Sequence, residues 1–241
     1  MPIEECGNMI NMMLDYTQRT GDISLVKAYS KHLNQWAEYL VANTLFPVNQ
    51  LTTVDFDGPL PNQTNLAIKG IIGIQAMSVI SKKYLGDVES ANSYNSTAAS
   101  YLKTWQSYAT SSNGTHLVLE YGYQSGDVLA FNLAMDKLLG LNFIPDSVNS
   151  MQSTYYENHL AKYGFPLDSR RTALYKLYIA GFPAANRRPL SQIDLTTLQV
   201  QAVPTKIVLW LEETLHYFFV SQIAMTFLNK IYQYVQGLTS S

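Results

Sequence analysis

Charged residues are scarce in this chain of 241 residues. Only 14% of its residues are Asp, Glu, Lys or Arg, whereas soluble domains usually carry about 25%. The formal net charge of −2 gives no support for a nucleic-acid partner, which would need a basic surface. Hydrophobic residues make up 47% of the chain, so a sizeable core can form. The 17 tyrosines fit either a tyrosine-rich core or a cleft that binds sugars or amides.

Cysteine is present once, as Cys6, so neither an intrachain disulfide nor a cysteine-cluster metal site is possible. A catalytic thiol would need a histidine partner, and the sequence places none of the four histidines beside Cys6; a small buried side chain is the favoured interpretation. His116, on a loop, is interpreted as a packing or solvated histidine rather than a base. The chain also lacks zinc, calcium, nucleophile-elbow and phosphate-loop patterns. We therefore expect no metal and no cofactor.

Long apolar runs and targeting segments are missing as well. No stretch of about 18 uninterrupted apolar residues suggests a membrane span, so we expect no membrane partner. The start, "MPIEECGNMINMML", has neither the basic head nor the cleavable apolar stretch of a signal peptide. Three Asn-x-Ser/Thr sequons, at Asn62, Asn95 and Asn113, matter only if the chain enters a secretory route.

Apolar residues recur with helical spacing through most of the chain. They predict six helices, over residues 8–20, 25–43, 66–86, 89–110, 128–141 and 146–164. The predicted inner face of the first helix is Met9, Met12, Met13 and Tyr16; that of the second is Leu25, Tyr29, Leu33, Trp36, Tyr39 and Leu40; that of the fourth is Tyr94, Ala98, Tyr101, Leu102, Trp105 and Tyr108.

Short and long connections between these helices alternate, which predicts antiparallel hairpins whose long loops share one side. No segment of 20 to 50 residues repeats, which disfavours an open solenoid. The predicted fold is therefore all-α, an α/α toroid of helical hairpins or part of one. We expect residues 1–171 to form this domain. Residues 172–241 differ in character and form a separate tail, with a predicted helix from about Thr205 to Gln236.

The third predicted helix has Lys69 as its only interior charge, so it should be buried on most sides. Gly70 and Gly73 would allow another helix to approach it closely. Either Thr64 or Asn65 is expected to cap it. Lys69 would either neutralise a carboxylate, Asp55 or Glu5, or extend its amine to solvent.

The loop before this helix, "VNQLTTVDFDGPLPNQTN", holds more polar side chains than a turn needs. We interpret it as the border of a small-molecule site. Paired carboxylates can serve as general acid and base if their environments separate their pKa values. The candidates are Asp55 and Asp57 in this loop, together with Glu4 and Glu5 at a helix entrance. Helix-dipole stabilisation explains Glu4 and Glu5 equally simply, and turn formation explains Asp55.

Further candidates could bind a substrate rather than react with it. Asn62 and Gln63 could bind an amide or a sugar by paired hydrogen bonds, as could Asn65 if it is not a cap. Arg170 could clamp a substrate carboxylate, although a structural salt bridge with Asp168 is the favoured interpretation.

Four stretches together resemble the glutaminase A family of fungi and bacteria: "MPIEECGNM", residues 40–74, "DKLLGLNFIP" and "YGFPLDSR". The resemblance covers residues 1 to about 171. It implies a six-helical-hairpin domain and an extracellular or cell-wall enzyme that converts L-glutamine to L-glutamate and ammonia. It also implies that this chain is a fragment, because family members carry a signal peptide and a β-rich N-terminal domain ahead of the first of these stretches.

The chain departs from the family pattern in two places. Members typically read T-D-D-F-A-G where this chain has Val54 and Asp57 in residues 53–58, and two motifs usual after Arg170 are absent. The sequence thus leaves two further readings open. One is a carbohydrate-active toroid that cleaves a glycan with two loop carboxylates. The other is an inactive fragment.

Overall fold

The structure is a computed structural model that describes residues 2–52, 58–160 and 165–170. All of these residues belong to the first of two units into which the chain divides, residues 1–193 and 194–241. Within the described residues the fold is all-α, as predicted: extended backbone occurs only as isolated bridges between single residues. The predicted tail, with its helix from about Thr205 to Gln236, lies outside the described residues.

The first hairpin joins α1 (Pro2–Thr20) to α2 (Ser24–Ala28) and α3 (Ser30–Asn43). Three residues separate α1 from α2, and the first of them, Gly21, turns the chain with φ +72°. Asp22 Oδ1 accepts a hydrogen bond from Ser24 N at 2.8 Å. The single helix predicted over residues 25–43 is instead two helices, which meet at Tyr29 with non-helical backbone angles.

The inner face predicted for the first helix is wrong in part. Met12 is 37% exposed, whereas Met13 is buried as expected. Apolar residues surround the helix between residues 9 and 14, so the period alone does not select one stripe. The helix begins at Pro2, six residues earlier than predicted, and this extension determines which stripe faces the core. The buried residues of this helix are Ile3, Glu4, Gly7, Ile10, Asn11, Met13, Leu14 and Thr17.

Helix α4 (Thr64–Ile80) is the central helix, buried on nearly all sides as predicted. It continues into η2 (Ser81–Leu85), a π-helical turn that ends at Gly86. The segment Thr64–Leu85 is the one described helix long and apolar enough to cross a membrane, but the rest of the chain buries 89% of its most apolar window. A core helix of a soluble domain has this same character.

Two glycines let other helices approach α4 closely, as predicted. A Cβ on Gly70 would overlap the side chain of Thr44, and one on Gly73 would lie 2.9 Å from Leu40 Cδ1. The approach is mutual, because a Cβ on Gly7 of α1 would lie 2.8 Å from Lys69 Cγ. These contacts set the spacing of α1, α3 and α4.

Helix α5 (Val88–Ala109) forms a second hairpin with α4. Asp87 caps it by accepting a hydrogen bond from Ser90 N at 3.0 Å. Trp105 is fully buried and donates its indole N–H to the Thr64 carbonyl at 3.1 Å. The predicted inner face holds at Ala98 and Leu102 and is wrong at one end, where Tyr108 is 47% exposed.

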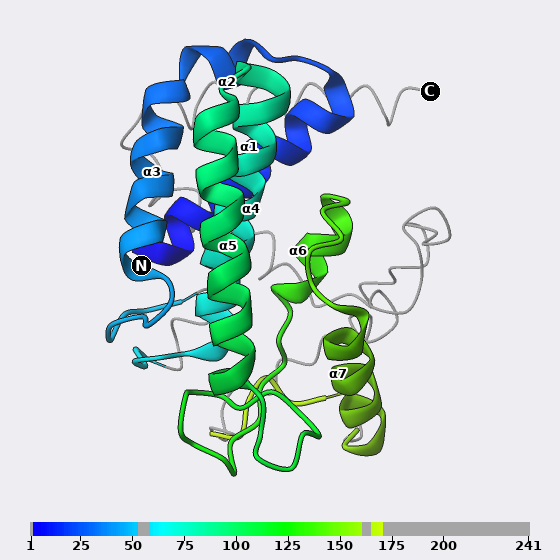
Figure 1. The fold of residues 1–241 in the computed structure, drawn as a ribbon. Helices are drawn as coiled ribbons and strands as arrows, with labels where there is room; N and C mark the ends of the chain where they lie inside the picture. Colours follow the sequence, from blue (N-terminus) through cyan, green and yellow to red (C-terminus); the bar gives the residue numbers. More distant parts are fainter. Residues whose placement is uncertain (1, 53–57, 161–164, 171–241) are drawn as a thin grey trace, which may run out of the picture. The chain divides into compact units, whose positions relative to one another are not determined.

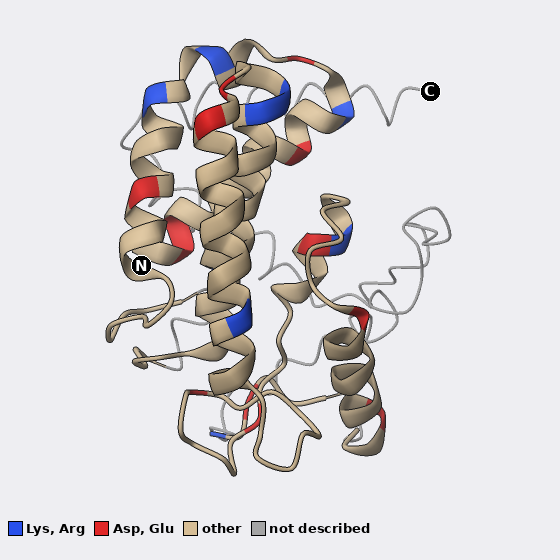
Figure 2. Ribbon diagram, viewed as in Figure 1, with Lys and Arg blue, Asp and Glu red and all other residues tan. Residues whose placement is uncertain are grey.

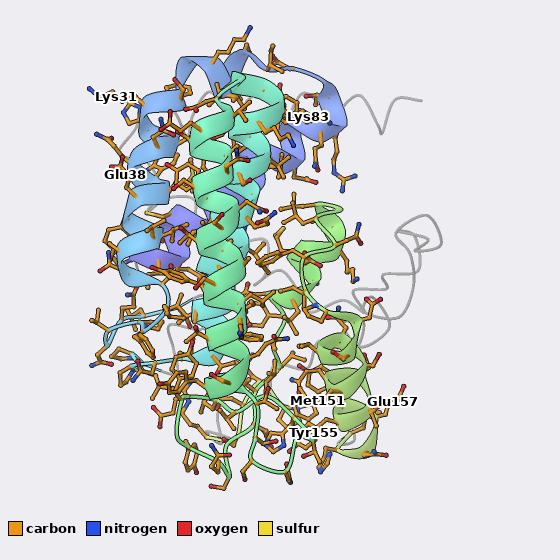
Figure 3. The ribbon with its side chains drawn as sticks, viewed as in Figure 1. Lys31, Glu38, Lys83, Met151, Tyr155 and Glu157 are labelled. Atoms are coloured by element: carbon orange, nitrogen blue, oxygen red, sulfur yellow. The ribbon has the colours of Figure 1, made fainter. Side chains whose placement is uncertain are left out.

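The last described helices are shorter than predicted. Of residues 128–141 only α6 (Leu133–Leu138) is helical, because residues 128 and 129 pair in extended form with residues 167 and 168. Helix α7 (Asp146–Asn158) ends six residues before the predicted end. Figure 3 shows Met151 and Tyr155 on the side of α7 that faces the loops after α5, and Glu157 on the other side.

One end of the bundle gathers the long connections. The start of α1, the end of α3, the start of α4 and the end of α5 all lie there, and the short turns lie at the opposite end (Figure 1). Ile3 N donates to Gln50 Oε1 at 3.0 Å, which ties the start of α1 to the loop after α3. Bridges then link Gln50 to Leu60 and Gln63 to Glu120. We call this the loop end, defined as residues 2–8, 44–52, 58–65, 110–132 and 165–170.

Candidate functional site

A buried ion pair joins Glu4 of α1, at the loop end, to Lys69 of α4. Lys69 Nζ contacts Glu4 Oε1 and donates a hydrogen bond to Asn8 Oδ1 at 2.9 Å. Both charged side chains are almost fully buried, at 7% and 3% exposure. Lys69 reaches Glu4 because Gly7 has no side chain in its way. Lys69 therefore neutralises a carboxylate, but that carboxylate is Glu4 and not Asp55 or Glu5, the two that the sequence suggested. The alternative of an amine extended to solvent is wrong.

Glu5 has a different environment from its neighbour. It is half-buried, and its pKa is raised by burial first and by the charge of Glu4 second. Its Oε2 atom is buried and has no hydrogen-bond partner among the described residues. Two adjacent carboxyl groups are thus unequal: Lys69 compensates the charge of Glu4, while burial and the charge of Glu4 raise the pKa of Glu5. This is the kind of asymmetry that acid–base chemistry uses.

The charged residues near this pair are few. Figure 2 shows a long stretch of α5 without charge, and many of the charged residues gather at the end of the bundle that carries the short turns. Asp55 and Asp57 lie outside the described residues. The described residues on either side of them, Thr52 and Gly58, adjoin the bridge between Gln50 and Leu60. Their chain neighbours are therefore at the loop end.

The three amide candidates hold loops together. Asn62 adopts φ +53°, donates its N–H to the Pro47 carbonyl at 2.7 Å, and accepts from Tyr121 N through its carbonyl. Gln63 is buried, and it, rather than Thr64 or Asn65, is the residue before the first turn of α4. The predicted caps are therefore wrong.

Asn65 has another partner because it lies inside the first turn of α4. Its Oδ1 accepts a hydrogen bond from Asn132 N at 3.2 Å, and Asn132 Nδ2 donates to the Asn65 carbonyl at 2.8 Å. The amide therefore fixes the segment before α6 against α4. A cap prediction counts only local partners, which is why the sequence missed this contact.

Asp168 and Arg170 form the salt bridge that the sequence favoured. Arg170 Nη2 lies 2.6 Å from Asp168 Oδ2, and Arg170 Nε lies 3.2 Å from Oδ1. Arg170 N also donates to Oδ1 at 2.8 Å. Asp168 is buried and pairs with Val128, so the bridge fixes the end of the described chain against the segment before α6.

A polar cluster that sequence reasoning missed lies beside this bridge. Asp127 is buried, and its Oδ2 accepts a hydrogen bond from the Tyr155 hydroxyl at 3.1 Å. The Tyr155 ring stacks between His116 and His159, with centroids 4.4 Å and 4.0 Å away. Burial lowers the pKa of His116. No local motif marks these residues, since they come from separate loops and α7.

Two other reactive possibilities fit the structure poorly. Burial raises the pKa of the Cys6 thiol to about 11, so little thiolate is available for nucleophilic attack at neutral pH. Among the described residues no group of three His, Cys, Asp or Glu side chains is placed to hold a metal ion.

The fold places this protein in the class of all-α helical-hairpin domains. Its candidate site is the pair of unequal carboxyl groups at the loop end. Comparison with known families gives the particular assignment. Residues 1–205 match the family described as the glutaminase A six helical-hairpin domain. This chain therefore belongs to the glutaminase A six-helical-hairpin family. The matched region extends beyond residue 171, although two motifs that are usual in the family after Arg170 are absent from this chain.

Two curated relatives are similar to this chain. Glutaminase A of Aspergillus oryzae is 43% identical over 202 residues, which cover 82% of this chain and 29% of the relative. A probable glutaminase of Arthroderma benhamiae is 36% identical over 163 residues, which cover 56% of this chain and 19% of the relative. The chain thus spans less than a third of the length of these relatives. No solved structure matches it.

Proposed function

We propose that this chain is the helical-hairpin part of a secreted amidohydrolase that converts L-glutamine to L-glutamate and ammonia. The observation that carries the proposal is the 43% identity to a protein named Glutaminase A. The chain covers 29% of that relative, so the proposal includes partners: further domains of the full-length protein that complete the site. We place the enzyme outside the cell or at the cell wall, as a glycoprotein.

Amide hydrolysis needs a proton donor for the departing ammonia and a group that activates water. Glu5 suits the donor, because its raised pKa keeps the carboxyl protonated to higher pH than in water. Lys69 holds Glu4 in place beside it and balances its charge. Asp55 is the proposed base, and Asp57 is a weaker second candidate.

Glutamine would also need groups that recognise it. Asn62 and Gln63 lie at the loop end and carry amide groups that can pair with the substrate amide. Arg170 would have to share its guanidinium between Asp168 and a substrate carboxylate. Such sharing is feasible, because guanidinium presents five donors.

The test is ammonia release from L-glutamine by the full-length parent, with two substitutions. Glu5→Gln and Asp55→Asn should each lower kcat by about 10²- to 10⁴-fold, the usual contribution of general acid–base catalysis. Glu157→Gln, on the exposed side of α7, is the matched control and should leave kcat unchanged. Unchanged kcat in either test variant removes that residue from the proposed mechanism.

A second candidate function is hydrolysis of a glycan. Phe46, Tyr108 and Tyr121 form an aromatic cluster at the loop end, with ring centroids 5.3 to 6.0 Å apart. Phe46 and Tyr108 are about half exposed, at 49% and 47%, which suits a surface against which sugar rings pack. Release of reducing sugar from glycans, without ammonia release from glutamine, would establish this function and contradict the first.

A further inference from the structure

The three sequons of this chain lie in different surroundings. We propose that Asn113 carries an N-linked oligosaccharide in the folded protein and that Asn62 does not. The inference rests on the secreted location proposed above, because glycan transfer occurs on chains that enter the secretory route. Such glycans are bulky and need an exposed surface position.

Asn113 lies at the tip of the tight loop between α5 and the segment that follows it. Residues 112–115 are all exposed, and Gly114 turns the chain with φ +69°. Asn113 Oδ1 accepts hydrogen bonds from Thr115 Oγ1 at 2.8 Å, Thr115 N at 3.2 Å and Ser111 Oγ at 2.8 Å. The backbone N–H can only donate, so this atom is the oxygen and the amide orientation is fixed.

This arrangement keeps the amide nitrogen of Asn113 free of the hydrogen bonds that hold Oδ1. All hydrogen bonds between Asn113 and described residues engage Oδ1, so Nδ2 is left on the exposed side of the loop. A hydroxyl that donates to Oδ1 polarises the carboxamide and makes the hydrogens on Nδ2 more acidic. Transfer forms a bond from Nδ2 to C1 of the sugar and breaks the bond from C1 to a lipid-linked pyrophosphate. Nδ2 loses one proton, and the lipid pyrophosphate leaves.

Asn62 lies in a position that a glycan would disturb. It is half-buried with φ +53°, and its backbone bonds to both Pro47 and Tyr121. The hydroxyl residue of its sequon, Thr64, is fully buried in the first turn of α4. A sugar chain on Asn62 would therefore have to project from between two loops that are in contact.

Asn95 lies in surroundings intermediate between those of Asn113 and those of Asn62. It is exposed on α5, and its Oδ1 accepts a hydrogen bond from Gln75 Nε2 at 3.2 Å. The helix directs Asn95 and Thr97 to nearly opposite sides, because residues two apart in a helix do not face each other. The arrangement seen at Asn113 is thus not available at Asn95 in the folded chain.

The test is glycopeptide mapping of the full chain, fused to a cleavable secretion signal and secreted from yeast. Peptide N-glycosidase in heavy-oxygen water converts each occupied Asn to labelled Asp. We expect the label at Asn113 in most secreted molecules and none at Asn62. Asn113→Gln and Thr115→Ala should abolish the Asn113 glycan, whereas Thr115→Ser, which keeps a hydroxyl, should retain it. Asn62→Gln should leave the glycan pattern unchanged.

Secretion failure does not prevent the measurement, since glycan addition precedes export and the cell-retained chain can be mapped in the same way. An unmodified Asn113 in both fractions would overturn the inference, as would secreted molecules with an occupied Asn62. The fused signal supplies entry to the secretory route whatever the natural location. Absence of ammonia release would therefore overturn the proposed function and leave the assignment of Asn113 intact.

Discussion

Lys69 carries the only charge inside the most buried helix, and it contacts a carboxylate 65 residues away. Removal of one partner of a buried ion pair leaves an uncompensated charge and typically costs about 3–5 kcal/mol. Lys69→Met should therefore lower the free energy of unfolding by about that amount. The measurement is urea denaturation followed by far-ultraviolet circular dichroism.

The double variant Glu4→Gln/Lys69→Met removes both charges and is the matched control. It should recover most of the lost stability, because a neutral pair no longer leaves a charge without a partner. If Lys69→Met is as stable as the parent, the ion pair does not hold α1 against α4.

Glu5 makes the free energy of unfolding depend on pH with a sign opposite to that of a salt-bridged carboxylate. Its pKa is raised in the folded chain by burial and by Glu4. Below the pKa of Glu5 in the unfolded chain, about 4.3, Glu5 does not lower the free energy of unfolding. As the pH rises through the pKa of Glu5 in the folded chain, the free energy of unfolding falls. Glu5→Gln should be more stable than the parent at pH 7, and the difference should vanish below about pH 4.

Urea titrations between acidic and neutral pH measure this difference. Glu157→Gln, on an exposed helix surface, serves as the control and should show no such trend. A stability gain for Glu5→Gln that is the same at every pH would contradict the assignment of the raised pKa to Glu5.

At the scale of elements, close helix contact depends on residues without side chains. A Cβ at position 70 would overlap Thr44, the residue at the end of α3. Gly70→Ala should therefore destabilise the protein by about 1–3 kcal/mol through overpacking, although alanine favours helix. Thermal unfolding measures this effect, with Ser100→Ala on the exposed side of α5 as the control.

A compensating variant tests the cause. Gly70→Ala/Thr44→Ala removes the atoms that overlap and should restore part of the lost stability. If Gly70→Ala alone raises the melting temperature, then α3 does not limit the space beside α4.

The same scale shows which elements the sequence could predict. Helices α1, α4, α5 and α7 were predicted as helices because their apolar residues recur with helical spacing over many positions. Residues 128–132 were predicted helical and are not, because Leu129 N finds the Leu167 carbonyl as its partner. That partner is distant in sequence, so a local pattern cannot reveal it.

At the scale of the whole molecule, Cys6 reports on the packing of the first unit. Its thiol pKa is raised to about 11, and it lies on α1, which packs against α3 and α4. At pH 8 its reaction with a disulfide reagent should be roughly a hundredfold or more slower than that of a free thiol with pKa about 8.5. In concentrated urea the rate should reach that of the free thiol.

The rate can be followed by absorbance at increasing urea concentrations, beside circular dichroism as the control. The two transitions should coincide if Cys6 becomes reactive only when the hairpins separate. Fast reaction in the absence of urea would show that α1 opens without the other helices.

The candidate site was predictable only in part. Glu4 and Glu5 were selected from the sequence as paired carboxylates at a helix entrance, and Lys69 was selected because a buried lysine is rare unless it is paired. The sequence could not choose which carboxylate Lys69 contacts, because that depends on how α1 and α4 are placed. Asp127 and Tyr155 were missed, since neither belongs to a recognisable pattern.

The sequence by itself determined the all-α class, the alternation of short and long connections and the family, since helical period and turn residues act over a few positions. Tertiary structure decided which stripe of α1 is buried, which glutamate contacts Lys69 and why the pKa of Glu5 is raised. These outcomes depend on contacts between residues far apart in sequence, and desolvation arises only when those residues pack together.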